Sequence, residues 1–176
     1  MIYIQDTVER NGAFSCAEAM MVAARTAPKA CGTDLIETMV LDGEDKDRLA
    51  AAMREIGTDN SDDAFFIRDA GNIDHCHYVV LIGTRVGARG LDCGFCGMES
   101  CAAAEAAGVS CALSVNDLGI AIGSAAATAA DHRVDNRVLF SAGKAALKLG
   151  LFSDKVRVAC GIGLATNGKN IFFDRK

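Results

Sequence analysis

The sequence predicts one α+β domain of mixed α/β type over residues 1–176, with a cysteine-rich metal-binding stretch at 91–111. Three observations predict this. Hydrophobic residues make up 51% and charged residues 23% of the 176 positions, a composition that can bury a sizeable core. Segments with helical periodicity are interspersed with short apolar runs typical of strands. Four of the eight cysteines fall within 91–111, among glycines.

The first helix is expected to begin at Ser15, because Ser15 and Glu18 form the Ser-x-x-Glu pattern of a capping box. Pro28 should end this helix, since proline cannot continue the helical hydrogen bonds. Residues 1–13 would form a short helix or an extended arm, and residues 29–34 a loop.

The next segments predict two strands separated by two helices. Residues 35–41 alternate loosely and predict a strand, whereas residues 45–56 carry their apolar positions on one helical face. A polar loop over 58–63 leads to a shorter helix over 64–70. Residues 76–84 are rich in Val and Ile and predict a buried strand.

The C-terminal part is expected to hold three helices and a β-hairpin. Asn116 or Asp117 can cap the second of these helices, and Asn167-Gly168 is typical of a hairpin turn. The predicted ranges are helices over 98–107, 117–130 and 135–149, and strands over 156–165 and 169–173.

The formal net charge of −5 argues against a nucleic-acid partner and against attachment to an anionic membrane surface. The first residues lack a basic start and a sustained apolar run, and no stretch of about 20 apolar residues is free of charge. We expect a cytoplasmic protein with no membrane attachment, whose cysteines stay reduced.

Four cysteines in the central stretch are candidate metal ligands. They follow the spacing Cys-x2-Cys-x4-Cys-x9-Cys and are Cys93, Cys96, Cys101 and Cys111. A Cys-x2-Cys loop must curl tightly to aim two sulfurs at one centre, and Gly94 and Gly97 permit the positive φ angles of such a curl. Four thiolates that converge in a reduced protein indicate an iron–sulfur cluster or a structural zinc ion.

The spacing favours a cluster over zinc. Structural zinc typically uses two short cysteine pairs, whereas only the first pair is tight here. Spread ligands suit a cubane, whose irons sit at separate corners. A [4Fe–4S] cluster is therefore the favoured centre, followed by [2Fe–2S] and then zinc. The spacing differs from bacterial ferredoxins, because Ala112 rather than proline follows Cys111.

Each of the other candidate residues also has an ordinary structural interpretation. Cys16, Cys76 and Cys160 are interpreted as small buried hydrophobes. Cys31 lies in a loop and is either a reactive thiol or a structural residue. The histidines that flank Cys76 share one strand face and could meet a metal, although an ordinary structural role is more common. No phosphate-binding glycine motif is present in the sequence.

The block from Leu91 to Ser124 resembles a family of uncharacterised prokaryotic proteins that contain a ferredoxin domain. The resemblance rests on Asp-Cys-Gly-Phe-Cys-Gly at 92–97 and on the segment that starts Val-Asn-Asp-Leu-Gly at 115. It runs over nearly the whole chain. It implies iron–sulfur binding and no particular reaction.

The segment from Ala24 to Asp34 is similar to one in the flavin nitroreductases, where it also precedes a strand. The similarity implies a nitroreductase-like sheet flanked by helices, with the cysteine stretch as an insertion, and a homodimer that holds FMN at its interface. The Arg-Arg-Ser start that binds the flavin phosphate in that family is missing. The remaining candidates for cofactor binding are Arg25, Lys29 and Lys169.

These observations predict a soluble iron–sulfur protein that passes electrons to a redox partner protein or to a bound flavin. One alternative is an FMN-dependent nitroreductase-like oxidoreductase, and another is a zinc-stabilised binding domain without redox activity. A homodimer is expected, partly because small residues recur every four positions at Gly119, Gly123 and Ala127 and would allow another helix or a flat ligand to approach. Whether the chain is an enzyme stays open.

Overall fold

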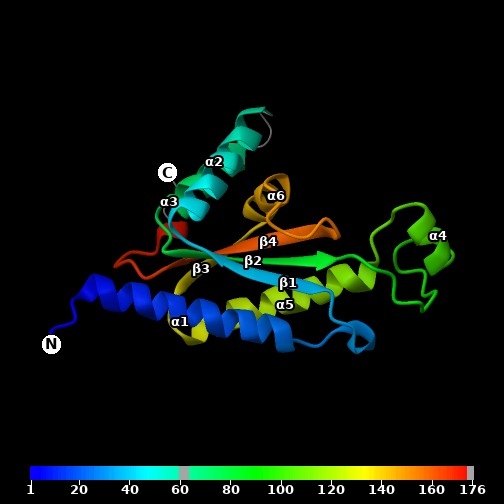
Figure 1. The fold of residues 1–176 in the computed structure, drawn as a ribbon, viewed down its shortest axis with the longest axis horizontal. Helices are drawn as coiled ribbons and strands as arrows, with labels where there is room; N and C mark the ends of the chain where they lie inside the picture. The colour runs from blue at the N-terminus through cyan, green and yellow to red at the C-terminus, as the bar shows by residue number, and fades with distance from the viewer. Residues whose placement is uncertain (60–63, 174–176) are drawn as a thin grey trace.

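The computed structural model describes residues 1–59 and 64–173. A four-stranded antiparallel sheet in the order β1-β2-β4-β3 lies between two layers of helices. Helices α1 and α5 cover one face, and α2, α3 and α6 lie on the other (Figure 1). The elements are α1 (Gln5–Thr26), η1 (Ala30–Gly32), β1 (Ile36–Leu41), α2 (Gly43–Asp59), α3 (Ala64–Asp74), β2 (Tyr78–Arg85), α4 (Cys101–Ala106), α5 (Ala112–Asp131), β3 (Asp135–Leu139), α6 (Phe140–Lys148), β4 (Val156–Ala165) and η3 (Ile171–Phe173). The mixed α+β class predicted from the sequence is confirmed.

Strand β2 is buried on both faces and separates two hydrophobic cores. Val79 and Leu81 face the core formed with α2, α3 and α6. Val80 and Ile82 face the core formed with α1 and α5. Alternate side chains of a strand point to opposite faces, so a continuous Val/Ile/Leu run is what two covered faces require.

The helices approach the sheet and each other closely through small residues. A Cβ on Gly143 of α6 would lie 1.9 Å from the carbonyl oxygen of Ala159 on β4, so this helix rests directly on the strand. Helices α1 and α5 pack through buried alanines, among them Ala17 and Ala121. The face of α5 that carries Gly119 is exposed.

The expected start of the first helix at Ser15 is wrong. Helix α1 begins at Gln5 and continues through Ser15 without a break. Of the residues added before Ser15, only Ala13 is buried and residues 5–8 and 10–12 are exposed, so the helix extends beyond both the capping pattern and its own buried stripe. The helix ends at Thr26, shortly before Pro28, as predicted.

Two C-terminal predictions are also wrong. Residues 135–139 form β3, which pairs with β4 along the edge of the sheet, instead of the first part of a helix. Residues 171–173 form the short 3-10 helix η3 instead of a hairpin strand. Thr58 and Asp59 belong to α2, and the rest of the expected loop over 58–63 lies outside the described residues.

Candidate metal centre

The cysteine stretch forms a lobe at one end of the sheet. The chain leaves β2 at Arg85, loops outward to the short helix α4 and returns to the start of α5 (Figure 1). A cavity of about 390 Å³ lies within this lobe. Its lining includes all four predicted ligands, Cys93, Cys96, Cys101 and Cys111. The structure thus brings the four cysteines around one space.

The backbone curls at the Cys-x2-Cys loop, as the glycines predicted. Gly94 and Gly97 have φ angles of 72° and 81°, in the left-handed region that favours glycine. The N–H of Gly97 donates to the carbonyl oxygen of Gly94 at 2.9 Å, which closes a turn around Cys96. This turn brings Cys93 and Cys96 to the same cavity.

Asp92 fixes the third cysteine relative to the first pair. Its Oδ1 accepts a hydrogen bond from the backbone N–H of Cys101 at 2.6 Å. Cys101 is the first residue of α4, and Ser100 caps that helix by accepting from the N–H of Ala103 at 3.1 Å. Asp92 itself adopts a positive φ of 46°, which Asp tolerates better than most residues.

Cys111 lies immediately before α5, where several backbone N–H groups surround its sulfur. Burial raises the pKa of this thiol, but hydrogen bonds from the backbone of Ser114, Leu113 and Arg89 together lower it below its usual value. A lowered pKa favours the thiolate, the form that binds metals.

The sulfurs do not close on a single point. In residues 1–59 and 64–173, no group of three or more His, Cys, Asp and Glu side chains is arranged to hold one metal ion. The four cysteines instead surround a cavity, with Cys93 exposed and the other three half-buried.

Sequence comparison decides the family. Residues 107–175 match a family described as "uncharacterized protein containing a ferredoxin domain" (DUF2148). An uncharacterised protein from Archaeoglobus fulgidus is 37% identical over 185 residues, which cover 99% of this chain and 98% of the relative. The chain belongs to this family. The matched segment contains Cys111 but not Cys93, Cys96 or Cys101.

The fold of this chain is that of the nitroreductases. A nitroreductase with bound FMN from Desulfitobacterium hafniense superposes with a TM-score of 0.62 at 13% identity, over 89% of this chain and 80% of that one. A nitroreductase family protein from Clostridium novyi gives 0.56 at 15% identity, over 97% and 81% of the two chains. An FMN-dependent nitroreductase from Clostridium difficile gives 0.57 at 15% identity, over 88% and 76%. At these identities the likeness concerns the fold.

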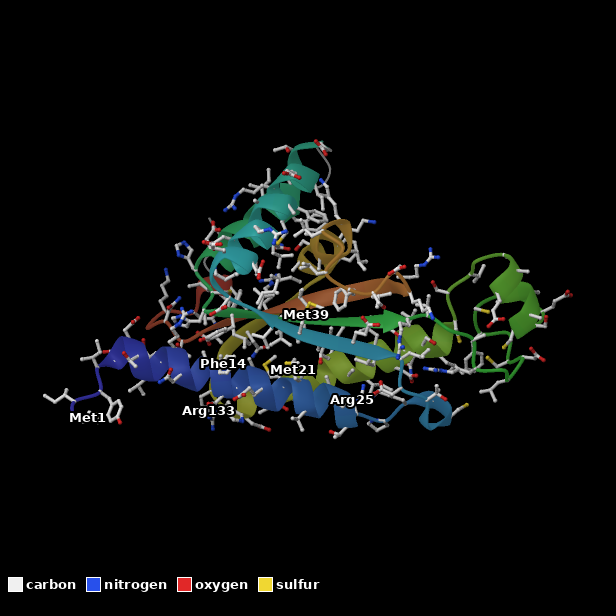
Figure 2. All side chains as sticks on the ribbon, in the orientation of Figure 1. Met1, Phe14, Met21, Arg25, Met39 and Arg133 are labelled. Carbon is white, nitrogen blue, oxygen red and sulfur yellow. The ribbon has the colours of Figure 1, made fainter. Side chains whose placement is uncertain are left out.

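Two of the three predicted cofactor-binding cations, Arg25 and Lys29, lie beside the same carboxylate, Asp34, whereas Lys169 lies elsewhere. Arg25, near the end of α1 (Figure 2), pairs with Asp34 at 2.6 Å. Lys29 donates from Nζ to the carbonyl oxygens of Ala24, Arg25 and Ala27, so it caps the C-terminus of α1. Lys169 lines a separate cavity beside α3.

The remaining thiols and the histidines do not line the cysteine cavity, and His75 lines the cavity beside α3. Burial raises the pKa of Cys76 to about 12, and its Sγ donates to the carbonyl oxygen of Asn72 at 3.2 Å. Cys16 is buried, and burial raises the pKa of both Cys16 and Cys160. These three surroundings agree with a packing role. Cys31 is exposed at the turn η1, with a φ of 57°.

Sequence reasoning missed the buried ion pair beside the cysteine lobe. Asp117, which was expected to cap a helix, lies inside α5 and pairs with Arg89. The position of Asp117 in the sequence could have revealed that this carboxylate is buried. Asp117 precedes the buried Ala121 and Ala125 at intervals of four, so it falls on the buried stripe of the helix.

Proposed function

We propose that this protein is an iron–sulfur electron-transfer protein, with a [4Fe–4S] cluster held by Cys93, Cys96, Cys101 and Cys111. The observation that carries the proposal is the placement of all four cysteines around one cavity of about 390 Å³. When bound, such a cluster supplies reversible one-electron transfer. Membership of a ferredoxin-domain family supports the same chemistry.

The arrangement of the donors suits a cluster better than a single zinc ion. Structural zinc typically uses two short cysteine pairs, whereas only Cys93 and Cys96 form such a pair here. All four cysteines line one common space. A cubane takes its thiolates at separate corners, and the lowered pKa of Cys111 provides one thiolate readily.

Residues of the lobe would adjust the reduction potential of the cluster and its accessibility. Asp92 and Glu105 line the cavity, and negative charge near a cluster lowers its reduction potential. The backbone N–H groups at Cys111 act in the opposite direction, because hydrogen bonds to a sulfur stabilise added negative charge. The exposure of Cys93 leaves the centre accessible to a redox partner protein.

An FMN-dependent nitroreductase-like oxidoreductase is the second candidate, favoured by the fold shared with FMN-binding proteins. In that case the homodimer interface would hold the flavin, and the exposed glycine-bearing face of α5 is where we place that interface. A zinc-stabilised binding domain is the third candidate.

Among the described helices, none has both the length and the apolar character to cross a membrane. We place the protein in the cytoplasm, where its thiols stay reduced.

A matched pair of cysteine variants tests the proposal. Cys96→Ala should abolish the visible absorption of anaerobically purified protein, because one cluster ligand is lost. Cys160→Ala is the control, since Cys160 lies on β4 outside the cavity lining, and it should keep the absorption. A coloured Cys96→Ala variant with full iron content would contradict the assignment.

A further inference from the structure

A second cavity adjoins the cysteine cavity, and three of its seven lining residues are cationic. It measures about 440 Å³, and its charged lining residues are Arg85, Lys155, Arg157 and Asp154. Val86, Gly87 and Arg157 also line the cysteine cavity, so these three residues form a shared wall.

A β-bulge places Arg157 at this wall. Thr84 pairs with Val158, but the next residue, Arg85, pairs with Val156, so Arg157 is an extra residue in β4. The core contacts show the same shift. Val156 packs in the core beside α2, α3 and α6, whereas Val158 packs against the core beside α1 and α5. Residues two apart in a regular strand share a face, so the bulge has released Arg157 from the alternation.

Two of the three cations that line this cavity have no partner among the described residues. In the described part of the chain, the exposed side chains of Lys155 and Arg157 make no hydrogen bond or ion pair. Arg85 is partly neutralised, because its Nε lies 3.6 Å from Glu37 Oε1. Asp154 is the opposing charge in the lining. The lining thus combines one carboxylate with two cations that have no partner among the described residues, on a protein whose formal net charge is −5.

We propose that this second cavity binds an oxyanion group, a phosphate or a carboxylate, of a small molecule. Arg157 is the main anion-binding residue, because its guanidinium can donate two parallel hydrogen bonds to such a group. Lys155 adds a second positive charge beside it. Because Arg157 belongs to both cavities, the bound molecule lies next to the cysteine lobe. That this molecule exchanges electrons with the centre rests on the proposed iron–sulfur function, whereas the anion binding does not.

Calorimetric titration of anaerobically purified full-length protein tests this proposal, with pyrophosphate and citrate as probes at low ionic strength. We expect saturable binding of at least one probe, and the tighter of the two identifies the phosphate or carboxylate class. Arg157→Gln and Lys155→Gln should each weaken binding by about tenfold or more, as expected for lost charge-assisted hydrogen bonds.

Arg133→Gln is the matched control. Arg133 is also exposed, but it follows the C-terminal end of α5, while the cysteine lobe joins the N-terminal end of that helix (Figure 2). The Arg133→Gln variant should bind the probe as tightly as the unmodified protein does. Absence of saturable binding, or equal weakening by all three substitutions, would overturn the proposal. Iron measured on the same samples separates the two hypotheses, because iron-free protein that still binds the probe contradicts only the cluster.

Discussion

Arg89 Nη2 lies 2.6 Å from Asp117 Oδ2, and each of the two side chains is only 2% exposed. Asp117 also accepts a hydrogen bond from the backbone N–H of Ala30 at 3.0 Å. The backbone of Arg89 in turn contacts the Cys111 sulfur. One buried carboxylate therefore joins the turn η1, helix α5 and the loop that begins the cysteine lobe.

Loss of this carboxylate should destabilise the protein strongly. Asp117→Asn would leave the Arg89 guanidinium buried without a counter-charge, and we expect a loss of about 3–5 kcal/mol in the free energy of unfolding. Denaturant titration measures it. Glu55→Gln is the control, because its ion pair with Lys148 is exposed and should contribute at most about 1 kcal/mol. Equal losses in the two variants would show that the buried pair has no special role.

The hydrogen bond from Cys101 to Asp92 predicts a graded effect on metal retention. Asp92→Ala removes the acceptor and places alanine at a positive φ, so we expect iron affinity to fall by about 10–100-fold. Asp92→Asn keeps an acceptor oxygen and a residue that tolerates this φ, and it should retain most of the iron. Iron release to a chelator provides the comparison. Similar release from both variants would mean that the bond does not order the site.

Thiol reactivity should differ sharply between two cysteines. In metal-free protein near neutral pH, iodoacetamide should modify Cys111, whose pKa is lowered, and spare Cys76, whose pKa is about 12. Mass spectrometry of peptides reports both, and iron loading should protect Cys111. Preferential modification of Cys76 would contradict this.

The same raised pKa of Cys76 gives a pH dependence of stability. Its folded-state pKa lies above the ordinary value of 9.0, so the fold favours the protonated thiol. The contribution of the protonated Cys76 thiol to the free energy of unfolding is fully present below about pH 9 and is lost as the pH rises towards 12. The difference in unfolding free energy between the unmodified protein and Cys76→Ala should therefore shrink over this range. A constant difference would indicate that Cys76 is not desolvated as described.

Local patterns predicted those parts of the fold that have strong local signals. Strands β2 and β4 follow from their apolar runs, and the curl around Cys96 follows from its glycines. Strand β3 was missed because its five residues include Asp135, Asn136 and Arg137, and only pairing with β4 along the sheet edge makes them a strand.

The two charged features of the site depend on non-local contacts. The bulge at Arg157 results from the register between β2 and β4, which are far apart in the sequence. The Arg89–Asp117 pair joins residues on opposite sides of the cysteine lobe. Neither contact has a sequence pattern of its own, although the buried stripe of α5 marks Asp117 as unusual.

The most direct test of the iron–sulfur assignment is the absorption spectrum of anaerobically purified protein, with iron, sulfide, zinc and flavin quantified on the same sample. We expect a broad visible shoulder that dithionite bleaches, with matching amounts of iron and sulfide near four per chain, as a [4Fe–4S] cluster requires. Colourless protein that carries one zinc ion per chain would contradict the assignment and would make the four cysteines a structural zinc site.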